Sequence, residues 1–176
     1  MIVYKQASTI EELEQILRLQ QQNLPKNLSP DEMTKDGFLT VEHSFELLKE
    51  MNDMCPHSIA VENKEVVGYA LCMHPKFAQS VEILRPMFHE INQVVQNRNN
   101  YMVMGQICVA KTHRGKGLFR KLYTTMKTNL PSGFDRIITE VDTKNQRSME
   151  AHAAVGFVEL KNYASDGKDW SLIVLQ

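Results

Sequence analysis

The sequence has little of several features that would mark a special class of protein. Its 176 residues contain only three cysteines, Cys55, Cys72 and Cys108, with no C-x-x-C spacing. We therefore expect buried thiols, not disulfides or zinc ligands. No apolar run approaches the ~18 residues that a membrane-spanning helix requires, and the N-terminus lacks the pattern of a signal segment. These absences predict a cytoplasmic protein that binds neither a metal nor a membrane.

Net charge is also small, but it is unevenly distributed. The formal net charge is -1 at pH 7. Residues 1–100 contain 9 Lys and Arg against 14 Asp and Glu, whereas residues 101–176 contain 11 against 7. This division favours an anionic ligand on the second part and a cationic one near the first, with solvated surface charge as the simpler alternative. The near-neutral total argues against a nucleic-acid-binding protein.

What is present is the composition of an ordinary globular protein. Hydrophobic residues make up 43% of the chain and charged residues 23%. A chain of 176 residues is long enough for one compact domain with a real core. We therefore expect a single domain that covers residues 1–176, without internal repeats.

The hydrophobic pattern predicts alternating strands and helices. Strands are expected at residues 2–5, in a hairpin over 58–73 with its turn at 62–65, and at 101–110, 136–141, 157–162 and 169–175. Helices are expected after Ser8-Thr9, over about 41–54, and at 79–96, 116–129 and 145–155. Residues 25–37 are expected to be a polar connector. Pro86 indicates either one kinked helix over 79–96, or a short turn followed by a helix that begins at the proline. The order of elements predicts an α/β layer fold.

The segment KTHRGKGLFRK, residues 111–121, joins a predicted buried strand to a predicted helix. Gly115 and Gly117 let the backbone approach a ligand, and Arg114 and Lys116 add positive charge. The first N–H groups of a helix and the positive end of its dipole favour an anion. The glycine spacing matches neither a Walker loop nor a dinucleotide fingerprint. By itself the segment indicates either a phosphate-binding loop or a turn without a ligand.

Two segments together resemble the GNAT superfamily of acyl-CoA-dependent N-acyltransferases. ICVAKTHRGKGLF is similar to the family's strand and [QR]-x-x-G-x-[GA] loop, with Arg114 at its first position and Gly117 at its fourth. TEVDTKNQRSMEAHAAVGF is similar to the family's E-V-x-x-x-N segment and the helix after it, with Glu140 and Asn145 at the motif positions. The resemblance covers about residues 102–160. It implies a mixed, mostly antiparallel central sheet of about seven strands flanked by helices.

The resemblance implies acetyl-CoA as the acyl donor and no metal. The pyrophosphate would lie on backbone N–H groups of the loop, and the pantetheine arm would pair with the strand before it. Asn145 would hydrogen-bond the cofactor, or would serve only as the N-cap of its helix. The cofactor-binding residues so implied are Ile107, Cys108, Val109, Arg114, Gly115, Lys116, Gly117, Leu118, Phe119, Arg120 and Asn145.

The implied reaction is direct attack by a primary amine on the thioester. An alkylammonium group with a pKa of ~10.4 must first lose a proton. Glu140 occupies the position of the glutamate that acts as the base in some members; a water relay or an ion-pair role are the alternatives. A backbone N–H near Cys108 or Val109 would stabilise the oxyanion. Cys108 itself is expected to be inert.

Two positions depart from the family pattern. His152 stands where many members have a tyrosine that protonates the leaving thiolate. An imidazole with a pKa of ~6.5 is mostly neutral at pH 7, so His152 is either a weaker acid or a packed structural residue. Phe119 stands where a small residue is usual, and its ring is expected to point away from the phosphates.

The acceptor site would be built from residues 24–53 and 74–100, as in the family. The acidic balance there favours a cationic amine, either a small molecule or a peptide. Homodimers are also common in the family. The alternative to an enzyme is a non-catalytic acyl-CoA sensor. Candidate polar groups for the acceptor are His43, Glu46, His57, Tyr69, His74 and His89.

Overall fold

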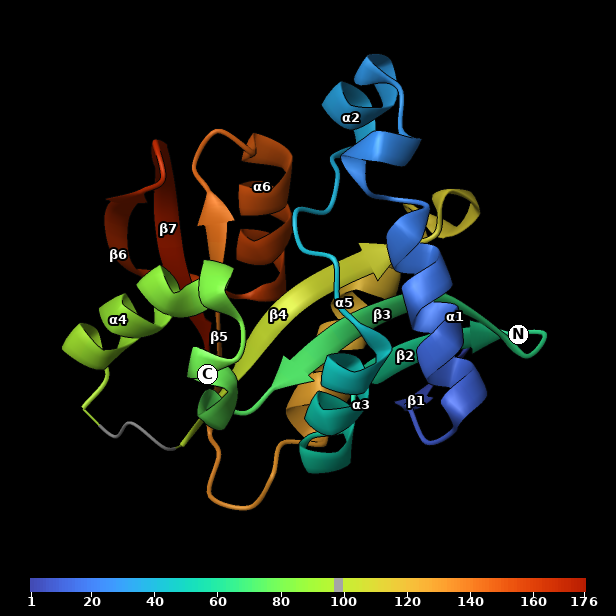
Figure 1. The fold of residues 1–176 in the computed structure, drawn as a ribbon, viewed down its shortest axis with the longest axis horizontal. Helices are drawn as coiled ribbons and strands as arrows, with labels where there is room; N and C mark the ends of the chain where they lie inside the picture. The colour runs from blue at the N-terminus through green and yellow to red at the C-terminus, as the bar shows by residue number, and fades with distance from the viewer. Residues whose placement is uncertain (97–99) are drawn as a thin grey trace. The chain divides into compact units, whose positions relative to one another are not determined.

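The structure is a computed structural model that describes residues 1–96 and 100–176. Its strands, labelled in Figure 1, are β1 (Val3–Gln6), β2 (Ser58–Glu62), β3 (Glu65–Met73), β4 (Tyr101–Val109), β5 (Arg136–Asp142), β6 (Val158–Ser165) and β7 (Lys168–Leu175). Its α-helices are α1 (Ile10–Gln21), α2 (Pro30–Asp36), α3 (Phe45–Met54), α4 (Arg85–Val94), α5 (Leu118–Thr128) and α6 (Gln146–Val155). The predicted acceptor segment 74–100 includes residues 97–99, which lie outside the described residues.

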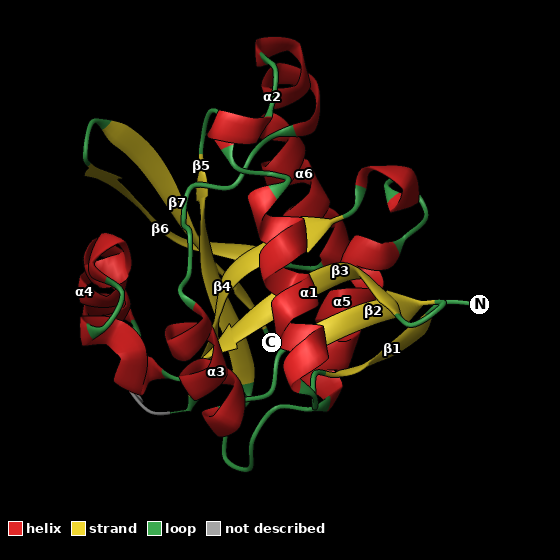
Figure 2. Cartoon of the chain, turned by 45° about the vertical axis from the view of Figure 1, so that its right-hand side comes forward, coloured by secondary structure: helices red, strands yellow, loops and turns green. Residues whose placement is uncertain are grey.

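The strands form a seven-stranded sheet in the order β1-β2-β3-β4-β5-β7-β6. The pairs β1–β2, β2–β3, β5–β7 and β6–β7 are antiparallel, whereas β4–β5 is parallel. Helices flank the strands, as Figure 2 shows. The predicted α/β fold, with a mixed, mostly antiparallel sheet of about seven strands, is confirmed.

The chain divides into two compact units, and the first comprises residues 1–72 and 105–129. In this unit α5 packs against β1 and β2, and α1 packs against α3. Gly68 of β3 marks a close approach. A Cβ there would lie 3.3 Å from the carbonyl oxygen of Cys108 and 3.4 Å from Cδ1 of Leu122. A side chain at position 68 would therefore disturb the packing of β3 against β4 and α5.

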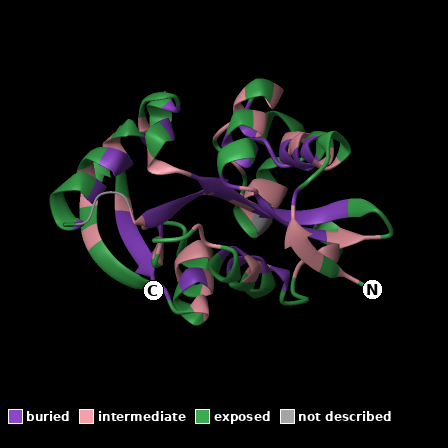
Figure 3. Cartoon of the chain, turned by 90° about the horizontal axis from the view of Figure 1, so that it is seen from below, coloured by how far each residue is buried: buried purple, intermediate pink, exposed green. Residues whose placement is uncertain are grey.

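The second unit comprises residues 73–104 and 130–176. Here α4 packs against β6 and β7, and α6 contacts β5. Ile137 and Ile138 of β5 and Leu172 of β7 have no exposed surface. Strands carry much of the buried surface, as the purple segments in Figure 3 show. At the carboxyl end of β5 burial alternates, because Glu140 and Asp142 are half-buried whereas Val141 between them is buried.

Local sequence signals explain where several elements begin and end. Thr9 Oγ1 accepts the Glu12 N–H at 3.2 Å, and the Glu12 carboxylate accepts the Thr9 N–H at 3.3 Å, which forms the capping box of α1. Asn63 and Lys64 adopt φ angles of +51° and +69°, the left-handed conformation that a two-residue hairpin turn requires. The predicted helix start and the predicted hairpin are confirmed.

Two predictions about helices need correction. Residues 25–37 are not merely a connector, because they contain α2. Ser29 and Glu32 form its capping box and Pro30 its first residue, a start signal that the sequence interpretation overlooked. Within 79–96 a single kinked helix is wrong. The alternative is confirmed, because α4 begins at Arg85 and places Pro86 in its first turn, where no N–H is needed.

Two helix starts lie later than predicted. α5 begins at Leu118 and not at residue 116, because Gly117 has a left-handed φ of +80° and caps the helix from outside. α3 begins at Phe45 and not near residue 41, because Ser44 Oγ accepts the Leu47 N–H at 3.2 Å and sets the N-cap there.

Candidate active site

A glycine-containing loop joins β4 to α5 in the first unit. The chain passes through the short 3-10 helix Lys111–His113 and then through Gly115 and Gly117, whose φ angles are +72° and +80°. A Cβ at either glycine would meet no atom within 4 Å, so crowding does not explain why glycine stands there. The left-handed backbone conformation does, because glycine adopts it without strain. No side chain caps the first turn of α5, and Lys116 beside it is exposed. This helix start suits an anion, which backbone N–H groups and the helix dipole would stabilise.

The charge of Arg114 suggests a contact with a bound phosphate, but its guanidinium group forms hydrogen bonds within the protein. Its Nε donates to the carbonyl oxygen of Val109 at 3.1 Å, and a terminal nitrogen donates to Asn23 Oδ1 at 2.8 Å. The guanidinium group therefore joins the end of β4 to the residues that follow α1. Arg114 holds the loop in place, a role that the motif did not predict.

Two further contacts anchor the first half of the loop. Lys111 Nζ forms an ion pair with Glu32 of α2. His113 Nε2 lies 3.0 Å from Glu62 Oε2 at the end of β2, and this hydrogen bond holds the pKa of Glu62 below its usual range. The segment before Gly115 is therefore fixed by side chains, and the glycines follow directly after it.

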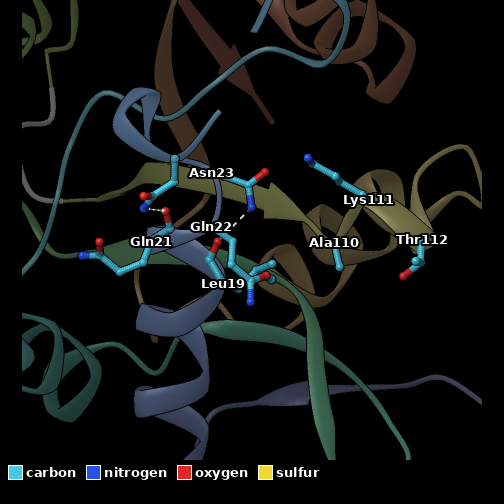
Figure 4. A pocket seen from close by; sticks show the side chains of 8 residues that line it. Leu19, Gln21, Gln22, Asn23, Ala110, Lys111 and Thr112 are labelled. Atoms are coloured by element: carbon cyan, nitrogen blue, oxygen red, sulfur yellow. Dashed lines mark hydrogen bonds between the residues drawn. The ribbon is translucent and has the colours of Figure 1, made fainter. Parts of the chain in front are cut away.

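A pocket of about 490 Å³ lies beside the first residues of this loop. Figure 4 shows the side chains that line it, which come from the end of α1, from the residues that follow this helix and from residues 110–112. Asn23 Nδ2 donates to the Leu19 carbonyl at 2.8 Å, and its Oδ1 accepts from Arg114, which fixes that side chain. Gln21, Gln22 and Lys111 add further polar groups. A polar ligand can form hydrogen bonds with this wall.

The end of β4 presents alternating burial. Cys108 is 7% exposed, whereas Ile107 and Val109 are half-buried. Burial raises the pKa of the Cys108 thiol to about 12, so the thiol is protonated at neutral pH. A protonated thiol is a poor nucleophile, which agrees with the expectation that Cys108 is inert.

A buried polar network joins four side chains of the first unit, and sequence reasoning did not foresee it. Gln20 Nε2 donates to Gln106 Oε1 at 2.8 Å, and the Tyr69 hydroxyl donates to the same oxygen at 2.7 Å. Gln106 Nε2 donates to the Val41 carbonyl at 2.9 Å. Two of the predicted acceptor residues, Tyr69 and His43, are therefore brought together by two glutamines.

The network determines which nitrogen of His43 carries the proton. Gln20 Oε1 accepts the His43 backbone N–H at 2.9 Å, so Gln20 Nε2 must be the group that faces His43 Nδ1, also at 2.9 Å. Nδ1 is then an acceptor, and Nε2 carries the hydrogen. His43 is only 5% exposed, and yet within the described residues its Nε2 has no hydrogen-bond partner. Burial lowers the pKa of His43 to about 4, so the ring is neutral.

Glu140 of β5 is a titratable group of the second unit whose pKa departs from its ordinary value. Its side chain is half-buried, and the Tyr163 hydroxyl of β6 donates to Oε2. Burial raises the pKa of Glu140 to about 7, although the hydrogen bond from Tyr163 acts in the opposite direction. A carboxyl group with this pKa can both accept and release a proton at neutral pH, as a general base must. Tyr163 was not predicted, because it lies on a different strand.

His152 and Asn145 both make contacts that a helix requires. His152 is 3% exposed, its Nδ1 lies 2.7 Å from the Ser148 carbonyl oxygen, and its ring packs edge-on against Phe157 at 5.1 Å. Burial lowers its pKa, so the ring is neutral at pH 7. Asn145 Oδ1 accepts the Ser148 N–H at 3.0 Å and caps α6. These contacts fit the structural alternative for His152 and the capping alternative for Asn145.

Phe119 in the first turn of α5 packs against a neighbour on its own helix. Its ring and that of Tyr123, four residues later, lie 5.2 Å apart at an angle of 69°. An edge-to-face pair of this kind is favourable. The contact supports the expectation that the ring points along the helix and not toward an anion at its start.

The remaining acceptor candidates differ in what they contact. His57 is fully buried, with Nδ1 accepting the Cys72 N–H at 3.0 Å and Nε2 donating to the Leu48 carbonyl at 3.1 Å, so its role is structural. His74 accepts the Lys76 N–H at 3.1 Å and lines a pocket of about 520 Å³ in the second unit. Glu46 and His89 are exposed. The acceptor role of Glu46, His74 and His89 stays a prediction.

Within residues 1–96 and 100–176, no three His, Cys, Asp or Glu side chains are grouped so that they could hold a metal ion. Over the same residues no helix has the length and apolar character needed to cross a bilayer.

Solved structures show where else this fold occurs. A chain of the NatC complex bound to Gag peptide and CoA has 20% sequence identity, covers 99% of this chain and 97% of its own, and has a TM-score of 0.66. The ribosomal-protein-S18-alanine N-acetyltransferase of Escherichia coli has 14% identity, coverage of 99% and 93%, and a TM-score of 0.64. YncA of Salmonella typhimurium, solved with its cofactor acetyl-CoA, has 17% identity, coverage of 100% and 94%, and a TM-score of 0.64.

Sequence comparison assigns the family. No curated protein matches the chain significantly. The profile of the Acetyltransferase (GNAT) family matches residues 13–157, a longer stretch than the two motifs alone suggested. Since this match covers most of the chain, and the fold agrees with it, the protein belongs to the GNAT family of acetyltransferases.

Proposed function

We propose that this protein transfers an acetyl group from acetyl-CoA to a primary amine by direct attack of the amine on the thioester. The observation that carries the proposal is Glu140, a half-buried carboxyl group whose pKa burial raises to about 7. It stands at the glutamate of the family's E-V-x-x-x-N motif. Membership of the family supports the transfer reaction, and Glu140 supplies the base that an amine requires.

The loop between β4 and α5 fits a coenzyme A pyrophosphate. Gly115 and Gly117 leave open space beside a left-handed backbone, and the first turn of α5 has no side-chain cap. The backbone N–H groups of residues 115–120 would hold the pyrophosphate, with Lys116 adding charge. Two of the similar structures contain CoA or acetyl-CoA. Acetyl-CoA supplies the activated acetyl group, and the residues of this chain bind and orient it.

Glu140 would accept the proton that the acceptor ammonium must lose. The amine nitrogen then forms a bond to the thioester carbonyl carbon, and the carbon–sulfur bond breaks to release the thiolate of CoA. The second proton of the nitrogen passes through solvent to this thiolate, so that the neutral amide and the CoA thiol are formed. A backbone N–H near Cys108 or Val109 is proposed to stabilise the oxyanion. His152 is proposed to have at most a minor role as an acid, because its ring is buried and neutral. The CoA thiolate then leaves without protonation by this side chain.

For the acceptor we propose a cationic amine on a peptide or a small molecule. Residues 1–100 carry the acidic excess of the chain, which attracts a cation. The NatC structure contains a peptide, which makes a peptide amine a natural first choice. A single catalytic domain, a cytoplasmic location and a homodimer stay predictions from the sequence.

Ligand-induced stabilisation followed by a transfer assay tests this function. Acetyl-CoA and CoA should raise the melting temperature, because a ligand present at about 100 times its Kd stabilises the folded protein by about 2.7 kcal/mol. ATP–Mg²⁺ and NADH should leave the melting temperature unchanged. A panel of free-amine peptides and polyamines is then tested for release of CoA thiol. Stabilisation by CoA with no transfer to any amine would favour a non-catalytic acyl-CoA sensor. No stabilisation by CoA would contradict the assignment of the loop.

A further inference from the structure

The hydroxyl of Tyr163 donates a hydrogen bond to Oε2 of Glu140, and these two residues lie on different strands, 23 positions apart. We propose that Tyr163 is a positioning residue that orients the Glu140 carboxylate and sets the pH range in which it accepts a proton. The inference rests on the proposed function, because it assigns a partner to the proposed base. It concerns a contact that neither family motif contains.

Strand register places both side chains on one face of the sheet. Tyr163 of β6 pairs with Trp170 of β7, and Glu140 of β5 pairs with Leu172 of β7. Directly opposite residues of antiparallel strands project to the same face, and so do residues two apart. Tyr163 therefore reaches diagonally across β7 to Glu140. Leu172 of β7, which pairs with Glu140, has no exposed surface. Spanning two strand spacings takes about 10 Å, which two long side chains together can bridge.

Helix α4 packs against the same face. Lys161, two residues before Tyr163 and on its face, forms an ion pair with Glu90 of α4 and donates to Gln93 Oε1 at 2.7 Å. The pair thus lies on the covered side of β6 and β7, and this cover contributes to the burial that raises the pKa of Glu140. The charged groups on this face beside Tyr163 and Glu140 are Glu90 from α4, Lys161 from β6 and Asp142, which lies two residues after Glu140 on β5 and pairs with Trp170. Lys161 neutralises Glu90.

The hydrogen bond leaves one carboxylate oxygen for chemistry. Because Tyr163 occupies Oε2, Oε1 is the oxygen that accepts a proton from the amine. Burial, together with the neighbouring Glu140 and Glu90, raises the pKa of the Tyr163 phenol, so the hydroxyl stays protonated and keeps donating. A hydrogen bond to the charged form of a carboxyl group favours that form. Tyr163 therefore prevents burial from making Glu140 too basic to be ionised at neutral pH.

The test is Tyr163→Phe, which removes one hydroxyl and keeps the ring. Carbon-13 NMR follows the carboxyl carbon of Glu140 against pH, with the signal assigned by its absence in Glu140→Gln. We expect the midpoint to rise by about one pH unit in Tyr163→Phe, the usual size of a charge-assisted hydrogen bond. Tyr4→Phe, a matched change on β1 in the other unit, should leave the midpoint unchanged. An unchanged midpoint in Tyr163→Phe would overturn the inference.

A kinetic measurement adds the functional consequence. For the amine that the wild type acetylates fastest in the panel, the acidic limb of kcat/KM should move to higher pH by the same amount as the NMR midpoint. The loss is then about eightfold at pH 6.5 and small at pH 9, with the KM for acetyl-CoA unchanged. A uniform loss at every pH would contradict a role in setting the pH range. If Glu140→Gln retains full transfer, the proposed base fails, while the NMR result still decides the contact.

Discussion

The loop at residues 115–117 and the region around Glu140 differ in the feature that would carry their proposed chemistry. The loop is exposed, and its key feature is a left-handed backbone that no neighbouring atom crowds. Glu140 is a half-buried side chain whose pKa is raised by burial and adjusted by one hydrogen bond. Binding an anion needs donors held by the backbone, whereas moving a proton needs a carboxyl group partly removed from water. The first region should therefore be sensitive to backbone conformation, and the second to single side-chain atoms.

The largest effect is expected from Glu140→Gln. An amide cannot accept the ammonium proton, so kcat for the acetylated amine should fall by about 100-fold, the usual lower bound for losing a general base. The Kd for acetyl-CoA should stay within about twofold of wild type, because the loop proposed to bind the cofactor is untouched. Steady-state kinetics and calorimetry measure both quantities.

Glu150→Gln serves as the matched control, because Glu150 is an exposed carboxylate on α6. It should keep wild-type kcat. Full activity in Glu140→Gln would show that a water relay removes the proton without this carboxyl group.

A second effect concerns stability at acid pH, to which buried His57 of the first unit and Glu140 contribute with opposite signs. Burial lowers the pKa of His57 to about 4, so the unfolded chain binds a proton more readily than the folded chain. Stability is therefore lost as pH falls from about 6.5 toward 4. For this one group the free energy of unfolding should drop by about 2 kcal/mol between pH 7 and pH 5.

Urea unfolding at both pH values, with His57→Gln, checks this expectation. The variant should be less stable at pH 7 but should lose about 2 kcal/mol less than wild type on acidification. His89→Gln, at an exposed histidine, should behave as wild type. Equal losses in His57→Gln and wild type would contradict the role of the buried ring. Glu140 acts with the opposite sign, because a raised carboxyl pKa stabilises the folded chain as pH falls.

Gly117→Ala tests whether the loop depends on its backbone. A non-glycine residue at φ +80° costs about 1–2 kcal/mol, so the Kd for acetyl-CoA should rise about tenfold if the loop shifts to relieve the strain. Gly133→Ala is a close match, since Gly133 has φ +86° and equally open surroundings but lies before β5. It should lower stability without changing the Kd. Equal Kd values for both variants would exclude the loop as the cofactor site.

The smallest effect is expected from Phe119→Ala. The ring packs against Tyr123 on the same helix, so its loss should change the Kd for acetyl-CoA by less than about twofold while lowering stability by about 1 kcal/mol. Calorimetry and urea unfolding separate the two effects. A large loss of affinity would mean that the ring contributes to the site.

Much of the fold follows from local sequence signals. The capping box of Thr9 and Glu12, the turn at Asn63 and Lys64 and the cap at Asn145 all act within four residues. Helix caps and turns can be predicted from sequence, because the residues that form them lie within a few positions of each other in the chain. Ser29 and Glu32 carry the same signal for α2, so the start of that helix is also encoded locally in the sequence.

The candidate site also has features that the sequence indicates and features that depend on the tertiary structure. The sequence alone determined that Gly115, Gly117 and Glu140 are candidates, because these residues stand at motif positions that resemble those of the GNAT family. Only the tertiary structure decided that Arg114 holds Asn23, 91 residues away, and that Tyr163 holds Glu140. The buried network of Gln20, His43, Gln106 and Tyr69 is of the same kind. Hydrogen-bond partners and burial depend on which distant segments pack together, and that packing sets the pKa of each group.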